Sequence, residues 1–424
     1  MPFASRPIAM LSCRIGVFAC RIGVLLWACW PLVASHAEAQ ASAGELPTET
    51  GIELQLGILQ QPAEIVSAVP DYLRPAGDEG LAGALQAVAD SNRTGKFLRQ
   101  HITLHTAQLS VPALQSDPAQ LISQAQAWVA AGSHILLVDL STANLQALRK
   151  QLPEYVLLIN IGNRDDSLRR QLCLPNTLHT RASYSMQTDA LAQWMRSRRL
   201  SKVLLVSGSS PQDAAYADAV KHSISKFGHK LVEQKVWQFE TDLRRVAGTE
   251  LQAFTRTDDY DLVWVADTAN LFGQLLPYNT HLPRPVIGTH GMLAAEWSGV
   301  IEAWGAVQLQ NRFRAQFNRA MTDKDFAAWI AVRALSEALI QSRSAEVTTL
   351  RTRMLAPDFS VAGYMGRKLS FRPWNGQLRQ PIPLFHQQAL VASAPLDGFL
   401  HPSNEMDTLG ADRRESRCQL SSTE

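Results

Sequence analysis

The sequence predicts an α/β protein whose parallel sheets form two similar units. Unbroken apolar segments, such as residues 135–140 and 156–161, alternate with helical patterns, which is typical of a parallel sheet covered on both faces. The alternation restarts near residue 189. Roughly 385 residues remain after a predicted N-terminal signal, too many for one compact core and enough for two domains.

The first unit alternates strands and helices from residue 51 onward. A helical stripe begins after Asp78 and Glu79, acids that suit a helix N-terminus, and Gly95 ends it. A second helix begins at Asp117-Pro118, where an acid can cap and proline occupies the first position. The predicted strands are residues 52–59, 102–104, 135–140 and 156–161.

The second unit repeats this pattern and is followed by additional helices. Its predicted strands are residues 203–206, 231–236, 262–266 and 286–288. Its predicted helices are residues 189–199, 211–227 and 246–254, with two more at 308–320 and 323–341. Two α/β units with further helices favour a bilobed molecule.

Residues 1–37 are predicted to form a cleaved secretory signal. Three arginines accompany an apolar run at residues 22–33 that is too short to span a bilayer. Ser35 and Ala37 have signal-peptidase spacing, and Ala37 with Ala39 offers a second site. A retained anchor helix is the alternative; lipid attachment at Cys29 is disfavoured by the bulky Trp27.

Removing the signal changes the charge and the cysteine count. The formal charge falls from +2 to about −1, which argues against nucleic-acid or membrane-surface partners. Only Cys173 and Cys418 remain, and two cysteines in an oxidising compartment most simply form one disulfide. Closing that ~245-residue loop would contribute about 4–5 kcal/mol on a chain-entropy basis. Two free thiols are the alternative.

Catalytic and metal-binding motifs are missing from the sequence. The turn at residues 208–210 is not a nucleophile elbow; it either binds an anion through helix N–H groups or is an ordinary turn. No dinucleotide-binding or Walker pattern occurs. His101 and His105 share a strand face without further ligands nearby. We therefore predict no enzyme activity, no catalytic residue and no metal site.

The ends of the predicted strands indicate a ligand cleft. Ligands of open α/β sheets bind beyond the carboxyl ends of the strands. Polar or small residues follow these ends at 141–142, 162–164, 207–210, 267–268 and 288–290. Arg164 at such an end suits a carboxylate ligand.

Several segments resemble the type I, branched-chain amino-acid class of ABC transporter substrate-binding proteins. Residues 78–98 resemble the first helix of that class, and residues 178–195 its first crossover. The segments WGAVQLQNRFRAQF and FRPWNGQLRQP, and the tail HPSNEMDTLGADRRESRC, are similar to the branch that accompanies pyrroloquinoline-quinone (PQQ)-dependent alcohol dehydrogenase systems.

The resemblance implies two doubly wound parallel-sheet lobes joined by a three-segment hinge. It places residues 48–178 and 304–378 in lobe 1, and residues 179–303 and 379–403 in lobe 2. A tail at residues 404–424 would then be tied back by the disulfide.

The resemblance also implies ligand-binding positions. By position, Ser141, Thr142, Gly162 and Asn163 in lobe 1 would hold the ligand's ammonium and carboxylate. In lobe 2, Tyr216 matches a tyrosine that contacts the ligand, and Asp267 matches an acid that follows a strand. Asn163-Arg164 departs from the small residues of amino-acid binders, which favours an anionic ligand. Ser209 in the lobe 2 turn and Trp304 at the second crossover complete the predicted set, Trp304 as a stacking surface for a flat ring.

The implied function is periplasmic capture of a small, anionic or aromatic ligand for an ABC permease. Candidate ligands are PQQ itself, an alcohol, an acid product or a related metabolite; no catalytic cofactor is expected. The alternative is a ligand sensor or accessory protein that docks onto a PQQ-dependent dehydrogenase without feeding a transporter.

Overall fold

The computed structural model describes residues 51–61, 69, 74–106, 118–238 and 243–420. The predicted signal lies outside these residues. Three sheets organise the described chain: a five-stranded sheet, a seven-stranded sheet and a small antiparallel sheet of three strands.

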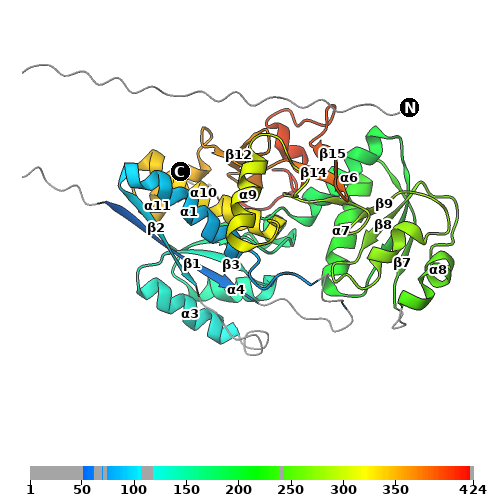
Figure 1. Ribbon diagram of the computed structural model, residues 1–424, viewed down its shortest axis with the longest axis horizontal. Helices are drawn as coiled ribbons and strands as arrows, with labels where there is room; N and C mark the ends of the chain where they lie inside the picture. Colours follow the sequence, from blue (N-terminus) through cyan, green and yellow to red (C-terminus); the bar gives the residue numbers. More distant parts are fainter. Residues whose placement is uncertain (1–50, 62–68, 70–73, 107–117, 239–242, 421–424) are drawn as a thin grey trace, which may run out of the picture. The chain divides into compact units, whose positions relative to one another are not determined.

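The five-stranded sheet is parallel, in the order β2-β1-β3-β4-β5. Its strands are β1 Ile52–Gln60, β2 Gln100–Thr106, β3 Ile135–Asp139, β4 Leu157–Asn160 and β5 Thr177–His179. Strands β3 and β4 are buried except at Asp139, the last residue of β3, because helices cover both faces. Figure 1 shows α3 and α4 on one face and α1, α10 and α11 on the other.

The helices of this part come from both halves of the sequence. They are α1 Leu81–Leu98, α3 Pro118–Ala130, α4 Thr142–Gln151, α5 Ser167–Arg170, α9 Ala306–Phe317, α10 Asp323–Ser342 and α11 Val347–Leu355. Gly83 allows α1 to pack closely on α10, because a Cβ there would lie 1.9 Å from the Asp325 carbonyl oxygen. We call the five-stranded sheet, these helices and the small sheet lobe 1.

The seven-stranded sheet has the order β15-β14-β10-β9-β8-β6-β7. Strands β6 to β10 are parallel, whereas β14 and β15 are antiparallel to their neighbours. Its strands are β6 Lys202–Ser207, β7 Lys230–Val236, β8 Leu262–Ala266, β9 Val286–Gly288, β10 Met292–Ala294, β14 Ile382–His386 and β15 Ala389–Ala394. Helices α6 Tyr184–Ser197, α7 Pro211–Lys226 and α8 Leu243–Phe254, with the 3-10 helix η2 Gly273–Tyr278, accompany it; together they form lobe 2.

The chain passes between the lobes three times. The first crossover joins β5 to α6, the second joins β10 to α9, and the third joins β13 to β14. The small sheet, β11 Val361–Ala362, β12 Lys368–Phe371 and β13 Leu378–Arg379, lies in the chain just before the third crossover. The predicted α/β fold class, with parallel sheets and flanking helices, is therefore confirmed.

The C-terminal segment contains the 3-10 helix η3 Glu405–Thr408 and then contacts both lobes. Asp407 forms buried ion pairs with Arg372 and Arg379. Farther along, the Ser416 hydroxyl donates to the Arg169 carbonyl, and Cys418 forms a disulfide with Cys173, the pairing that the cysteine count predicted.

Candidate ligand-binding cavity

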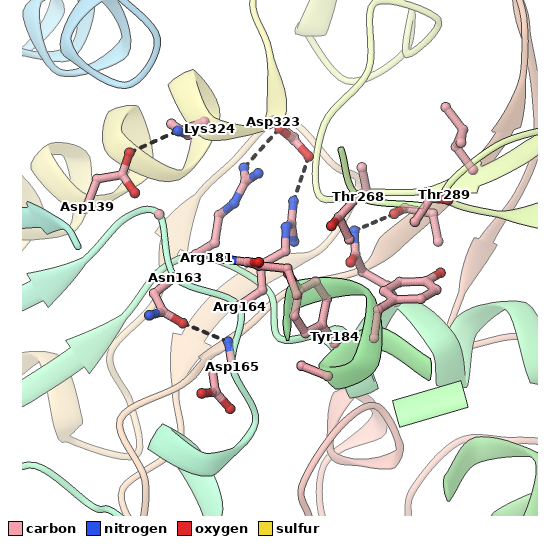
Figure 2. A pocket seen from close by; sticks show the side chains of 18 of the residues that line it. Asp139, Asn163, Arg164, Asp165, Arg181, Tyr184, Thr268, Thr289, Asp323 and Lys324 are labelled. Atoms are coloured by element: carbon pink, nitrogen blue, oxygen red, sulfur yellow. Dashed lines mark hydrogen bonds and ion pairs between the residues drawn. The ribbon is translucent and has the colours of Figure 1, made fainter. Parts of the chain in front are cut away.

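A cavity of about 1080 Å³ is lined by residues of both lobes. It lies at the carboxyl ends of strands β3, β4, β8 and β9, where open α/β sheets bind ligands. The first turns of α6, α7 and α10 also contribute. Figure 2 shows side chains from these elements around the cavity.

Most of the predicted binding residues line this cavity. They are Ser141, Thr142, Gly162, Asn163, Arg164, Tyr216 and Asp267. Ser209 is exposed and is not among the lining residues. Trp304 is 56% exposed, and its indole packs over Gly366 at a separate small hollow.

The lobe 1 wall is a network of short polar side chains. The Thr142 hydroxyl donates to Asp165 Oδ2 at 2.7 Å and accepts from Asn163 Nδ2 at 3.1 Å. Asn163 also donates to the Leu140 carbonyl, which ties the turns after β3 and β4 together. The Ser141 hydroxyl caps α4 by accepting from the backbone N–H of Asn144. Much of this wall's hydrogen-bonding capacity is therefore used within the protein.

Gly162 lies directly over a partly buried ion pair in the same wall. A Cβ at Gly162 would lie 1.6 Å from Asp139 Oδ1, so no larger residue fits while that carboxylate keeps its position. Asp139 Oδ2 in turn lies 2.9 Å from Lys324 Nζ at the start of α10. The position of the turn after β4 therefore depends on the end of β3 and on the start of α10.

The lobe 2 wall contains aromatic and capping residues. The Tyr184 and Tyr216 rings meet edge-on with their centroids 5.4 Å apart, and burial raises the pKa of both phenols. Asp267 is 1% exposed, and its carboxylate accepts the backbone N–H groups of residues 271–273. Asp213 holds Thr268 by accepting from both its backbone N–H and its hydroxyl.

Arg164 is engaged by two carboxylates that sequence analysis did not identify. Its Nη2 lies 2.6 Å from Asp323 Oδ2 and 3.0 Å from Glu296 Oε2, whereas Nη1 donates to the Ala182 carbonyl. Arg181 Nη1 contacts the same two carboxylates, at 2.9 Å and 3.2 Å. We call Arg164, Arg181, Glu296 and Asp323 the hinge cluster, because Arg181 and Glu296 lie on the first two crossovers.

Ion pairing in the hinge cluster opposes the effect of burial on two of its members, Asp323 and Arg181. Burial alone would raise the pKa of Asp323, but Arg181 and Arg164 outweigh that effect and lower it to about 2. Burial opposes the charged form of Arg181 as well, yet Asp323 and Glu296 raise its pKa above the ordinary value. Arg181 and Glu296 lie on crossovers, which carry no periodicity, and Asp323 begins helix α10, so no local pattern marked these three residues as members of the cluster.

No group of three or more histidine, cysteine or acidic side chains among the described residues is arranged to hold a metal ion. No helix in that part of the chain has both the length and the apolar character of a membrane span.

Several solved structures similar to this chain are bacterial binding proteins. A branched-chain amino-acid ABC transporter periplasmic ligand-binding protein from Burkholderia xenovorans superposes with a TM-score of 0.67 at 14% identity, covering 87% of this chain and 99% of its own. A leucine-, isoleucine-, valine-, threonine- and alanine-binding protein from Brucella ovis gives 0.63 at 14% identity, covering 79% and 89%. A solute-binding protein from R. palustris, in complex with benzoate, gives 0.60 at 14% identity, covering 81% and 96%.

Sequence comparison points to the same class. No curated protein sequence matches the chain. Residues 73–253 match the family described as periplasmic binding protein. The chain therefore has the type I periplasmic binding protein fold, and over residues 73–253 it carries the sequence pattern of that family.

Proposed function

We propose that this protein is a periplasmic solute-binding protein that holds a small molecule between its lobes and presents it to an ABC permease. The observation that carries the proposal is the cavity of about 1080 Å³, which residues of both lobes line at the carboxyl ends of the strands. A site of this kind encloses its ligand when the lobes rotate about the crossovers.

The lining supports binding rather than catalysis. The lining combines aromatic side chains, Tyr184, Tyr216 and Trp297, with hydroxyl and amide side chains such as Thr142 and Gln187. The matching family consists of binding proteins. The predicted signal over residues 1–37 would deliver the protein to the periplasm, where binding proteins work.

The test ligands follow from the resemblance and from the similar structures. PQQ, C1 to C4 alcohols and their acids represent alcohol oxidation, the process that the resemblance indicates. Branched-chain amino acids and benzoate represent what the similar proteins are named for binding or were solved with. PQQ is flat, which suits the aromatic side chains, but it carries three carboxylates, and the charges of the lining decide whether these are accepted.

A thermal-shift screen of the mature protein with these ligands tests the proposal. A true ligand at a hundred times its dissociation constant should stabilise the protein by about 2.7 kcal/mol. Small-angle scattering of the ligand-bound protein should show a smaller radius of gyration, because the lobes close on the ligand. If saturating ligand left the radius unchanged, a rigid accessory protein would be the better description.

A further inference from the structure

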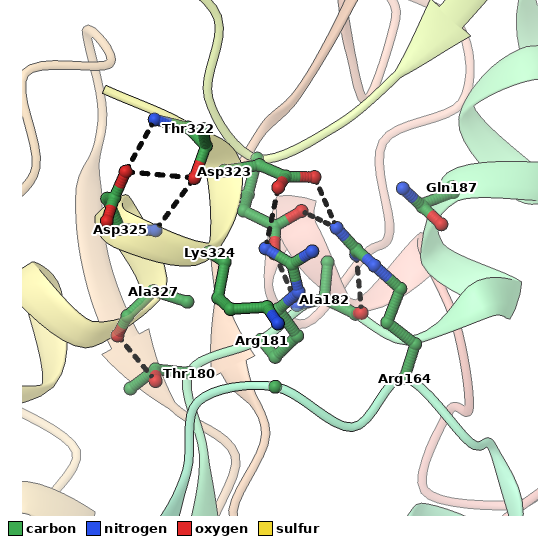
Figure 3. A network of polar contacts seen from close by, with 12 residues as sticks. Arg164, Thr180, Arg181, Ala182, Gln187, Thr322, Asp323, Lys324, Asp325 and Ala327 are labelled. Atoms are coloured by element: carbon green, nitrogen blue, oxygen red, sulfur yellow. Dashed lines mark hydrogen bonds and ion pairs between the residues drawn. The ribbon is translucent and has the colours of Figure 1, made fainter. Parts of the chain in front are cut away.

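The charges that line the cavity lead to an inference about ligand class, which rests on the proposed binding function. The lining contains three described cationic side chains, Arg164, Arg181 and Lys324, and each of them has a carboxylate partner within the protein. Lys324 pairs with Asp139, and the two arginines share Asp323 and Glu296. Figure 3 shows both guanidinium groups converging on the Asp323 carboxylate.

The burial of the hinge cluster makes this pairing difficult to open. The Glu296 side chain is fully buried, and those of Arg181 and Arg164 are only 8% and 10% exposed. Removing one partner from a buried ion pair leaves an uncompensated charge, which typically costs about 3–5 kcal/mol. An anion that bound Arg164 would have to displace Asp323 or Glu296, so it would meet this cost first.

The remaining carboxylates of the lining accept hydrogen bonds within the protein, and they add negative charge. Asp165 accepts from the Thr142 hydroxyl and from the Ser167 backbone N–H. Asp267 accepts from three backbone N–H groups of lobe 2. Because carboxylates outnumber cations around the cavity, a multiply charged anion would approach negative charge without finding an unpaired cation.

We propose that Glu296 and Asp323 determine ligand specificity: by neutralising Arg164 and Arg181, they exclude multiply charged anions and reserve the cavity for ligands of zero net charge. Asp323 faces the cavity side of the cluster, since its side chain is 28% exposed whereas that of Glu296 is fully buried. It is therefore the residue whose neutralisation should most directly release Arg164 to an incoming anion.

Calorimetric titration with citrate, a tricarboxylate, and with succinate, a dicarboxylate, tests this proposal. The wild-type protein should not bind either anion at millimolar concentration. Asp323→Asn preserves the side-chain shape and removes the charge, and it should bind citrate at least tenfold more tightly than the wild type. Added sodium chloride should weaken that binding, as expected for a charge pair at a partly exposed site.

Two matched variants show whether the effect belongs to the cluster. Asp165→Asn changes the net charge of the lining by the same amount but releases no arginine, so its citrate affinity should equal that of the wild type. The double variant Arg164→Gln with Asp323→Asn should lose the citrate binding that Asp323→Asn gained. Asp323→Ser, which suits the first turn of a helix, replaces Asp323→Asn if the latter does not fold.

Three outcomes would overturn the proposal. In the first, the wild type binds citrate or PQQ as tightly as Asp323→Asn does. In the second, Asp165→Asn and Asp323→Asn increase citrate affinity equally, and in the third a folded Asp323 variant shows no increase in citrate affinity. Failure of the proposed binding function would appear separately, as the absence of any stabilising ligand for the wild type in the thermal-shift screen.

Discussion

Among single residues, the Asp323 carboxylate has a clear consequence for stability at low pH. Burial would raise its pKa, but Arg181 and Arg164 lower it from 3.8 to about 2. Because the folded-state pKa is the lower one, the ion pairs stabilise the fold fully above about pH 4. This contribution, about 2 kcal/mol, is lost as the pH falls towards 2. Urea unfolding midpoints of the wild type should therefore fall more steeply between pH 4 and 2 than those of Asp323→Asn; parallel curves would contradict this assignment.

Gly162 gives a second prediction at this scale. In Gly162→Ala the new Cβ would displace Asp139, which lies 1.6 Å from its position, and so weaken the ion pair with Lys324. We expect a loss of about 1–3 kcal/mol in the free energy of unfolding. Gly77→Ala is the matched control, since a Cβ there meets nothing within 4 Å. Chemical denaturation of both variants measures the difference, and equal stabilities would mean that Asp139 moves without cost.

At the scale of elements, the start of α7 combines a cap with a contact to the cavity wall. The Ser210 hydroxyl accepts from the Asp213 backbone N–H, and the Asp213 carboxylate accepts from the Ser210 backbone N–H. Asp213 is fully buried and also holds Thr268, which lines the cavity. One residue thus joins a helix terminus in lobe 2 to the binding surface.

Two substitutions separate these roles. Ser210→Ala removes the cap alone and should cost about 1 kcal/mol of stability with no change in ligand affinity. Asp213→Ala also leaves the Thr268 groups without their acceptor, so it should cost more stability and weaken the binding of a ligand found in the screen. Denaturation and calorimetry on both variants provide the comparison. Equal effects on affinity would show that Thr268 keeps its position without Asp213.

The elements also show which parts of the fold could be read from the sequence. Strands β8 and β9 have the predicted bounds, because an unbroken apolar run between polar turns has one simple interpretation. Strands β14 and β15 and helix α4 were not predicted. Helix α4 carries few apolar residues, since only one side of it is covered, and β15 is mostly exposed at the sheet edge. The local pattern thus identified the buried strands β8 and β9 and missed the exposed edge strand β15.

The residues of the candidate site were likewise predicted in part: those at strand ends were identified, whereas the partners of Arg164 were not. Strand ends are local features, so Ser141, Thr142 and Asn163 were predicted as ligand-binding residues, and they line the cavity. The partners of Arg164 were not predicted. Glu296 and Asp323 lie 132 and 159 residues away in the sequence, and only the crossovers bring them together. No spacing rule links residues that meet through a hinge.

For the whole molecule, the C-terminal segment adds a further connection between the lobes. In lobe 2, Lys226 of α7 donates to the carbonyls of Thr408 and Gly410, which belong to the C-terminal segment. Asp407 pairs with Arg372 and Arg379 of lobe 1, and farther along the Arg417 N–H donates to the Arg170 carbonyl and Cys418 bonds to Cys173, both also in lobe 1. The disulfide thus fixes the far end of a segment whose near end Asp407 already anchors through buried ion pairs.

Replacing both cysteines by serine should therefore loosen the far end of the C-terminal segment more than its near end. The free energy of unfolding should fall by up to about 4–5 kcal/mol, since the 245-residue loop of the unfolded chain is no longer closed. In native-state hydrogen exchange, protection should be lost at residues 416–420 first, whereas residues 404–411 should keep theirs through Asp407 and Lys226. Thiol counting on the unfolded, unreduced mature wild type should find no free thiol. Uniform loss of protection along the segment would mean that the disulfide, and not the ion pairs of Asp407, holds the whole tail.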